Sequence, residues 1–238
     1  MKKIFKYYFI KFFVGKGWHN KKRFYLLWRF ITWVDIFLNG IFSNRSPYPF
    51  LTQYNNREHC LWIQLNHYCV KNGLGNFLSI YWDDETNNVL NDNVDDSFCC
   101  AIHPGFGGIF KWIYDNNRQG VIISNDPDIS GITEDVIVIP NNKNCLIQLL
   151  KEHRKGKVAI VAIDKVSNSN NKYSLLSESA LMASMKVYKK VILVNDKIDS
   201  DGRIVLKATC KELNDNNFHS TIIEWAKAET GSQEWRFL

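Results

Sequence analysis

The chain has 238 residues, of which 45% are hydrophobic and 23% are charged, and its formal net charge is +6. This length suits one domain or a small domain with an appendage, and the apolar content excludes a disordered or collagen-like chain. The six cysteines lack the paired spacing of a zinc site. Buried reduced thiols, and therefore a reducing compartment, are the favoured interpretation.

The positive charge is concentrated at the amino terminus. Residues 1–46 hold ten Lys and Arg residues and one acidic residue, a net charge of +9, so the remaining residues are net acidic. A secretory signal is not predicted, because Lys6 and Lys11 interrupt the apolar stretch and no small-residue cleavage site follows. We expect a basic, aromatic segment at 1–46, attracted to anionic surfaces, and an α/β domain at 47–238.

Residues 24–42 predict an amphipathic helix. Its polar members recur every three or four residues and form one narrow stripe: Arg29, Thr32, Asp35 and Asn39. Charges on two turns argue against a membrane span, which leaves a helix in the membrane interface or one packed deeply on the domain. The lysines and aromatic residues favour the interface. A nucleic-acid partner is not expected, because the aromatic residues form an apolar helix face and do not alternate with exposed cations.

The next segment predicts a loop at 43–57 and a helix followed by a strand within 61–82. His67 lies in it, but no strand-like run precedes this histidine, so a surface or core role is favoured over a site. Residues 83–96 contain six acidic residues and four asparagines and are expected to form a solvated loop. Their spacing lacks the central glycine and terminal glutamate of a calcium loop.

From residue 98 onward, short apolar runs alternate with amphipathic stretches. This alternation predicts an α/β fold with a mostly parallel central sheet and helices on both faces, preceded by the amphipathic segment. The expected strands are 98–102, 121–123, 136–139, 158–163, 190–194 and 203–209, and the expected helices are 109–116, 145–154, 177–185 and 220–228.

A histidine follows the first of these strands. His103 ends the apolar run Phe98–Ile102 and is followed by a Pro-Gly turn and a helix. Because parallel sheets carry their sites at the carboxyl ends of strands, His103 is a candidate general base; the alternative is an incidental histidine in a strand-to-helix turn. Asn125, Asp126 and Asp164 fall at similar strand ends.

Four blocks in this order resemble a known family. They are His103 with its glycine turn, the helix–Lys-Gly–strand–aspartate run at 149–164, the small-residue helix, strand and hairpin at 177–204, and the closing Gln-x-Trp segment at 224–237. Together they resemble the lipid A biosynthesis (lauroyl/myristoyl) acyltransferases of the glycerolipid and lysophospholipid acyltransferase superfamily. The basic, aromatic amino terminus is similar in character to the membrane-associating start of that family.

The resemblance implies transfer of a fatty acyl group from an acyl-carrier protein or acyl-CoA to a hydroxyl or amine, with His103 as general base. Candidate oxyanion and substrate-binding residues are Gly105, Phe106, Gly107, Gly108, Asn125 and Arg118. We expect no metal and no cofactor beyond the acyl donor, and a peripheral position on the cytoplasmic face of the inner membrane. Partners would be an acidic carrier protein, with Arg118, Arg154, Lys155 and Lys157 as candidate contacts, and an anionic membrane.

The acyl chain needs an apolar groove beside the site. Candidates for its wall are Phe106, Ile109, Phe110, Trp112 and Ile113, for which plain core packing is the alternative.

One position departs from the family motif, a histidine followed five positions later by Asp or Glu. That position is Gly108. Another acid, such as Asp126 or Asp164, reaches His103 from a neighbouring strand end, or His103 acts without an acid, or the reaction has been lost. The last case defines the alternative function, a non-catalytic homologue that binds lipid or carrier protein, or a subunit of an acyltransferase complex.

Overall fold

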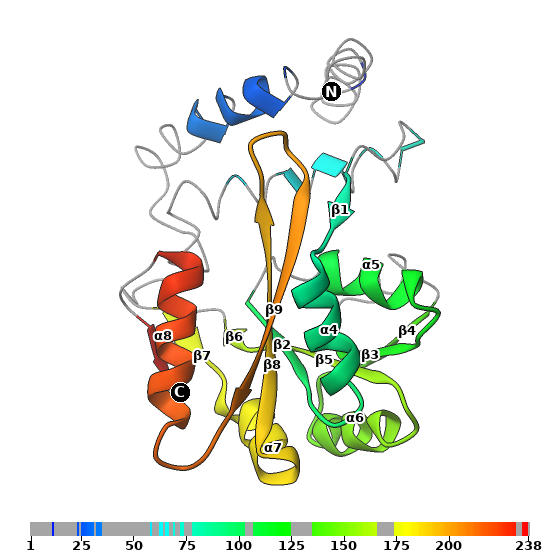
Figure 1. The fold of residues 1–238 in the computed structure, drawn as a ribbon, viewed down its shortest axis with the longest axis vertical. Coiled ribbons are helices and arrows are strands. Elements are labelled where there is room, and N and C mark those ends of the chain that lie inside the picture. The colour runs from blue at the N-terminus through cyan, green and yellow to red at the C-terminus, as the bar shows by residue number, and fades with distance from the viewer. Residues whose placement is uncertain are drawn as a thin grey trace.

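The computed structural model describes residues 11, 23, 25–30, 32–34, 58, 62–63, 65–66, 69, 72–73, 78–102, 107–124, 135–165, 174–231 and 235–237. The elements, in chain order, are β1 (Ile80–Tyr81), α4 (Asp84–Asn93), β2 (Cys99–Ala101), α5 (Gly107–Asp115), β3 (Gly120–Ile123), β4 (Val136–Ile139), α6 (Cys145–His153), β5 (Val158–Ala162), β6 (Asp164–Lys165), β7 (Ser174–Leu176), α7 (Glu178–Tyr188), β8 (Lys190–Ile198), β9 (Ile204–Glu212), α8 (Phe218–Thr230) and β10 (Trp235–Phe237) (Figure 1).

The main sheet is mostly parallel. Within the described residues it has seven strands, in the order β1-β9-β8-β2-β5-β3-β4. Only β9 runs antiparallel to its neighbour β8, and β1 runs parallel to β9. The predicted α/β class is therefore confirmed.

Helices cover both faces of this sheet, as the alternation of strands and helices predicts. One hydrophobic core lies under α6, α7 and α8, and a second lies under α4 and α5. In Figure 1, α8 lies on one side of the sheet and α4 and α5 lie on the other. The central strand β2 contributes to both cores, since Cys99 and Cys100 face opposite sides and both are fully buried. A strand that is buried on both faces carries apolar residues at consecutive positions, and for this reason the run Phe98–Ile102 predicts a strand.

The expected loop at 83–96 is wrong, because residues Asp84–Asn93 form the helix α4. Asp83 caps this helix, and its side chain accepts a hydrogen bond from the amide of Thr86 at 3.0 Å. Leu90 and Val94 lie one turn apart and are fully buried. The many acidic and asparagine side chains form the exposed face, and this composition concealed the apolar spacing beneath.

A small second sheet has the order β10-β7-β6 among the described residues. The chain leaves the main sheet after β5, and Asp164 in β6 pairs with Leu176 in β7. The closing segment adds β10, in which Trp235 is buried and its Nε1 donates to Thr230 Oγ1 at 2.9 Å.

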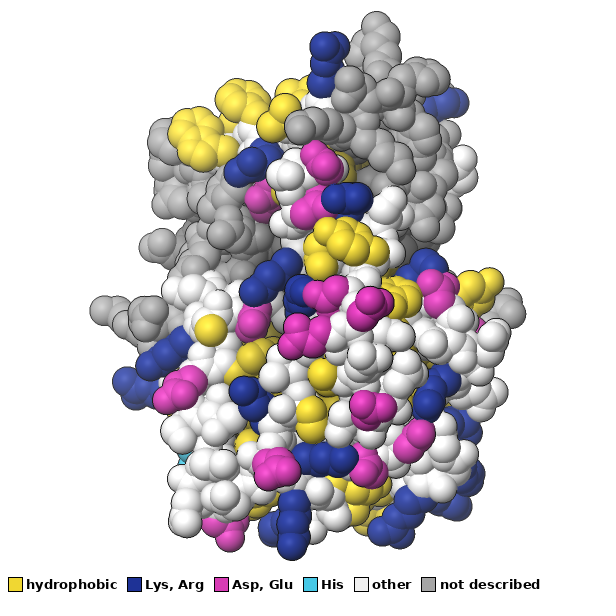
Figure 2. All heavy atoms as spheres, in the orientation of Figure 1, with side chains coloured by type: hydrophobic (Ala, Val, Ile, Leu, Met, Phe, Trp, Pro, Cys, Tyr) yellow, Lys and Arg dark blue, Asp and Glu magenta, His cyan; other side chains and the backbone are white. Residues whose placement is uncertain are grey.

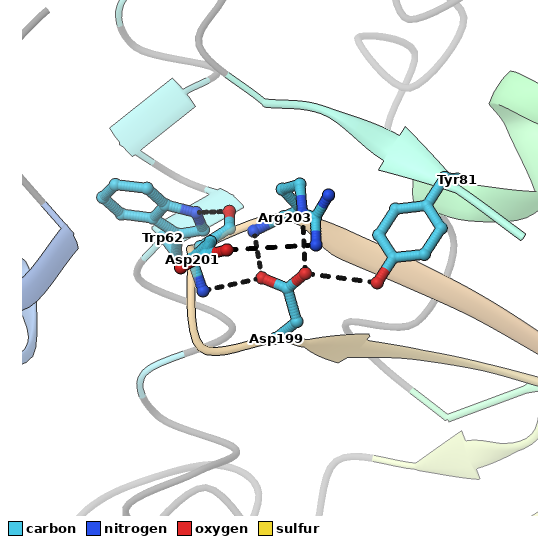
Figure 3. Close-up of polar contacts among 6 residues, drawn as sticks. Trp62, Tyr81, Asp199, Asp201 and Arg203 are labelled. Atoms are coloured by element: carbon cyan, nitrogen blue, oxygen red, sulfur yellow. Dashed lines mark hydrogen bonds and ion pairs between the residues drawn. The ribbon is translucent and has the colours of Figure 1, made fainter. Parts of the chain in front are cut away.

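The β8–β9 hairpin extends beyond the cores and is held at its tip by Asp199. This carboxylate accepts hydrogen bonds from the amides of Asp201 and Arg203, at 2.8 and 3.0 Å, and from Arg203 Nε at 2.7 Å (Figure 3). Tyr81 of β1 donates its hydroxyl to the same carboxylate at 3.1 Å, and the Arg203 guanidinium lies 4.9 Å from the Tyr81 ring centroid. The predicted Asp-Gly turn is thus confirmed, in a hairpin longer than expected.

An aromatic cluster joins this hairpin to the amino-terminal segment. Trp62 donates its Nε1 hydrogen to the carbonyl of Gly202 at 2.9 Å, and the Tyr25 ring lies 5.1 Å from the Trp62 ring. Gly202 has φ +80°, and a Cβ there would meet the Tyr25 ring at 2.8 Å. The hairpin tip therefore requires glycine both for its backbone conformation and for this close approach.

The described residues of 25–34 are helical, and they divide between two environments. Tyr25 and Thr32 are buried, whereas Leu26, Leu27, Phe30 and Trp33 are exposed, the last two at 60% and 55%. Figure 2 shows hydrophobic side chains gathered at this end of the molecule, with basic side chains beside them. Of the helix predicted for residues 24–42, the described part is thus partly packed on the domain and partly open to solvent, and residues 35–42 lie outside the described residues.

Candidate functional site

The candidate site lies where β2, β5 and β8 approach their carboxyl ends. Ala101 pairs with Val194 on one side and with Ala162 on the other, so these three residues lie side by side in the sheet. The chain continues from Ile102 through residues 103–106 into the first turn of α5. His103, Gly105 and Phe106 lie outside the described residues, as do Asn125 and Asp126, which follow β3.

A buried carboxylate occupies this part of the described structure, and it belongs to Asp196 of β8. The residue is 5% exposed, and its Oδ2 accepts a hydrogen bond from the Gly108 amide at 2.8 Å. Its Oδ1 has no hydrogen-bond partner among the residues that the structure describes. Burial raises the pKa of the Asp196 carboxyl to about 7, although the amides of Gly108 and Gly107 act in the opposite direction.

This pKa gives the group a specific chemistry. Burial favours the neutral form of this carboxyl more than in an exposed aspartate, and a cation or strong donor beside Oδ1 would favour the ionised form.

The first turn of α5 is fitted to this carboxylate. A Cβ on Gly108 would lie 2.3 Å from Asp196 Oδ1 and 2.7 Å from the Leu206 Cβ. A Cβ on Gly107 would meet Asp196 Oδ2 at 3.3 Å. The amides of both glycines bond to Asp196, which differs from the expectation that they stand open to a substrate oxygen.

Asp164 occupies the corresponding place on the other side of β2. It follows Ala162 by two residues, as Asp196 follows Val194, and it is 6% exposed. However, Asp164 belongs to β6 of the small sheet, so the chain has already turned out of the main sheet there. Of the two carboxylates, only Asp196 lies on a strand of the main sheet that continues past β2.

Arg118, Lys155 and Lys157, which are predicted as substrate or carrier contacts, lie away from the candidate site. Arg118 stands just before β3 and pairs with Asp95 at 2.7 Å. Lys155 and Lys157 stand just before β5, and both pair with Glu152. Because these strands are parallel to β2, their amino ends lie at the edge opposite the carboxyl ends that form the candidate site.

The candidates for an acyl-groove wall on α5 are core residues. Ile109, Phe110, Trp112 and Ile113 are all buried in the core between α5 and the sheet. Phe106 lies outside the described residues. Plain core packing, the alternative for these positions, is what the structure shows for the four that it describes.

Burial also decides the role of the neighbouring thiols. It raises the pKa of both Cys99 and Cys100 well above the ordinary value for a thiol. Since the thiolate is the reactive form, neither side chain is suited to act as a nucleophile.

Asp196 is the residue that the sequence interpretation missed. The strand was expected to end at Val194, whereas β8 runs to Ile198 and carries the carboxylate within it. Applying the strand-end rule to the run at 191–194 would have pointed to Asn195 and Asp196, just as it pointed to His103.

Comparison with known protein families and with curated protein sequences finds no match to this chain. Among the described residues, no cluster of three His, Cys, Asp or Glu side chains is arranged to hold a metal ion. No helix in the part of the chain that the structure describes has the length and apolar character needed to cross a membrane.

Proposed function

We propose that this chain is an acyltransferase that moves a fatty acyl group from a carrier-protein or CoA thioester to a hydroxyl or amine, with His103 as general base. The observation that carries the proposal is the buried carboxylate of Asp196, bonded to the first turn of α5 at the end of β2. Residues 103–106, which include His103, connect β2 to α5 in the sequence.

The reaction needs few groups. The unprotonated nitrogen of the His103 imidazole takes the proton of the acceptor hydroxyl or amine while that acceptor attacks the thioester carbonyl carbon. The tetrahedral intermediate then expels the thiolate as the carbon–sulfur bond breaks. The imidazolium returns its proton to the sulfur, so the histidine is regenerated and no covalent enzyme intermediate forms.

The test compares wild type with His103→Ala. Release of free thiol is measured from lauroyl-CoA and from lauroyl-carrier protein, with micelles of a lysophospholipid or an amino-sugar lipid as acceptor. Loss of a general base lowers a rate by about 10²–10⁴-fold, so we expect a loss of that size for His103→Ala. His219→Ala is the matched control, because this exposed histidine of α8 pairs with Glu178 away from the site. Equal rates for wild type and His103→Ala would overturn the proposal.

The second candidate is a non-catalytic homologue that binds lipid or carrier protein, and Gly108 is the observation that favours it. An acid at position 108 is excluded by the packing of Asp196 and Leu206. The same assay separates the two functions, because this candidate predicts no thiol release from wild type with either donor.

We also propose that the protein attaches peripherally to an anionic membrane surface through the helix at 25–34. The support is its exposed face of Leu26, Leu27, Phe30 and Trp33, which lies in the basic segment. Aromatic and aliphatic side chains on one helix face, with basic residues around them, suit the boundary between lipid headgroups and acyl chains. Each basic residue near such a surface contributes about 1 kcal/mol of attraction.

A further inference from the structure

The helix α5 begins with two glycines and has no acidic residue in its first turn. The amide hydrogens of a first turn have no partner within their own helix, and their positive potential favours a negative group beside them. Asp196 of β8 supplies this group, because its Oδ2 accepts the Gly108 amide hydrogen at 2.8 Å and the Gly107 amide acts on the same carboxyl. The start of α5 is therefore capped by a strand that is distant in the sequence.

This capping carboxyl lies in close, apolar packing. Asp196 is 5% exposed, and its Oδ1 has no hydrogen-bond partner among the described residues. The ideal position of a Gly108 Cβ lies 2.3 Å from this oxygen and 2.7 Å from the Leu206 Cβ, so the turn, the carboxyl and the leucine are in contact. An ionised oxygen without a donor is far more costly in such a place than a neutral carboxyl. Burial thus opposes the charge that the amides favour.

The Asp196 carboxyl is not part of an ion pair within the described structure. The causes of its pKa shift are burial and the two glycine amides, and no charged side chain is among them. Ionisable groups on the surrounding elements have other partners: Lys111 of α5 pairs with Asp115, Tyr81 of β1 donates to Asp199, Lys207 of β9 pairs with Asp83 before α4, and Lys197 of β8 pairs with Glu229. On this face β2 carries the thiol of Cys99, whose pKa is raised by burial.

We propose that Asp196 and the first turn of α5 form a proton-dependent contact, in which the neutral carboxyl holds the turn against β8 and loss of its proton weakens that hold. The contact joins one helix to one strand of the main sheet, so its opening is a local change at the start of α5. It does not depend on which reaction the protein catalyses.

The direction of the pH dependence follows from the two states of the turn. In the closed turn, burial raises the pKa of the Asp196 carboxyl to about 7, whereas an open turn exposes the carboxyl to water and returns it to the ordinary value of 3.8. The stabilisation is complete below the lower value. Between the two values the closing equilibrium constant falls about tenfold for each pH unit, and above about pH 7 it changes no further.

Hydrogen exchange at the Gly108 amide tests this contact. Gly107 and Gly108 form the only Gly-Gly pair in the sequence, so labelling glycine with both ¹³C′ and ¹⁵N isolates the Gly108 amide in a spectrum that correlates each amide with the preceding carbonyl. After correction for the intrinsic exchange rate, its protection factor should fall about tenfold per unit between pH 5 and 7 in wild type.

Two variants control this measurement. Asparagine keeps an acceptor for the Gly108 amide but cannot ionise, so the protection factor should be independent of pH in Asp196→Asn. Asp164→Asn changes the other buried aspartate that follows a strand beside β2 and should retain the wild-type fall. A constant protection factor in wild type, or an equal fall in Asp196→Asn, would overturn the proposal.

Stability supplies a second readout with an unusual sign. Relative to wild type, Asp196→Asn should be more stable at pH 8 than at pH 5, by at least about tenfold in the ratio of the two unfolding equilibrium constants. The reverse order would contradict the proposal. If this variant fails to fold, the ¹³Cγ signal of Asp196 in wild type replaces it: a titration midpoint near 7 supports the contact, and a midpoint near 3.8 overturns it. None of these measurements involves turnover, so a protein that releases no thiol can still show the contact.

Discussion

Gly108 and Asp196 share one small volume, and each constrains the other. The glycine has no side chain to displace the carboxylate, and the carboxylate accepts the glycine's amide hydrogen at 2.8 Å. Leu206 closes the same space from β9, since it pairs with Asp196 across the hairpin. A substitution at any of these three positions therefore disturbs the packing of the other two.

Substitution of the two helix glycines should separate this packing from helix propensity. Gly108→Ala places a Cβ 2.3 Å from Asp196 Oδ1, and overpacking of this kind destabilises by about 1–3 kcal/mol. Gly107→Ala meets its nearest neighbour, Asp196 Oδ2, at 3.3 Å, which requires a shift of only a few tenths of an ångström, so it should destabilise less than Gly108→Ala. Urea unfolding of both variants and wild type measures the difference. The packing account is contradicted if both variants have the same midpoint.

At the scale of elements, α4 shows how a capped helix can be concealed by its composition. Asp83 serves two partners, because its Oδ1 accepts from the Thr86 amide and its Oδ2 pairs with Lys207 of β9. These contacts hold the pKa of the Asp83 carboxyl well below its usual range, and the hydrogen bond from Lys207 has the largest effect. The cap thus both begins the helix and ties it to the sheet.

Removal of this cap should be measurable. Asp83→Ala is expected to lower the free energy of unfolding by about 1 kcal/mol, as loss of an N-cap typically does. Because the folded-state pKa is lowered, this contribution is present above the unfolded value near 3.8 and is lost as the pH falls below it. Asp84→Ala, one residue inside the helix, is the control and should change stability by only a few tenths. A difference between wild type and Asp83→Ala that persists unchanged at pH 2 would contradict the ionised cap.

At the scale of the whole molecule, one end differs from the rest. The exposed aromatic face of the helix at 25–34 lies beyond the tip of the β8–β9 hairpin, to which Tyr25 and Trp62 attach it (Figures 1 and 2). Asp196 lies on the same strand as the start of that tip. The β8–β9 hairpin therefore carries Asp196 and, at its tip, contacts the segment that bears the proposed membrane surface.

Binding to vesicles tests the surface. The double variant Phe30→Gln/Trp33→Gln should bind vesicles of phosphatidylglycerol and phosphatidylcholine at least roughly tenfold more weakly than wild type in flotation, since each buried aromatic side chain contributes on the order of 1 kcal/mol. Tyr114→Gln is the matched control, because Tyr114 is as exposed as Phe30 but lies on α5. Wild-type binding should also weaken as salt rises. Unchanged flotation of the double variant would rule out this face.

Sequence reasoning recovered the parallel sheet because its strands are buried on both faces and read as continuous apolar runs. It recovered the hairpin turn at Asp201 and Gly202 for an equally local reason, since the turn requires a positive φ. It failed at α4, where polar composition outweighed the apolar spacing, and at Asp196. The Asp196 carboxylate is recognisable as a site residue only from its hydrogen bond with Gly108, which is 88 residues away in the chain. No local sequence pattern predicts that contact.

The contact between Trp62 and Gly202 has a consequence for the order in which the chain is made. The two residues are separated by 140 positions, so during synthesis the aromatic side chains near the amino terminus emerge long before the hairpin that covers them. Contacts of such long sequence separation form late, and exposed apolar surface in the interval invites aggregation. Tyr25 and Trp62 therefore lack the hairpin tip against which they pack until residue 202 has been synthesised.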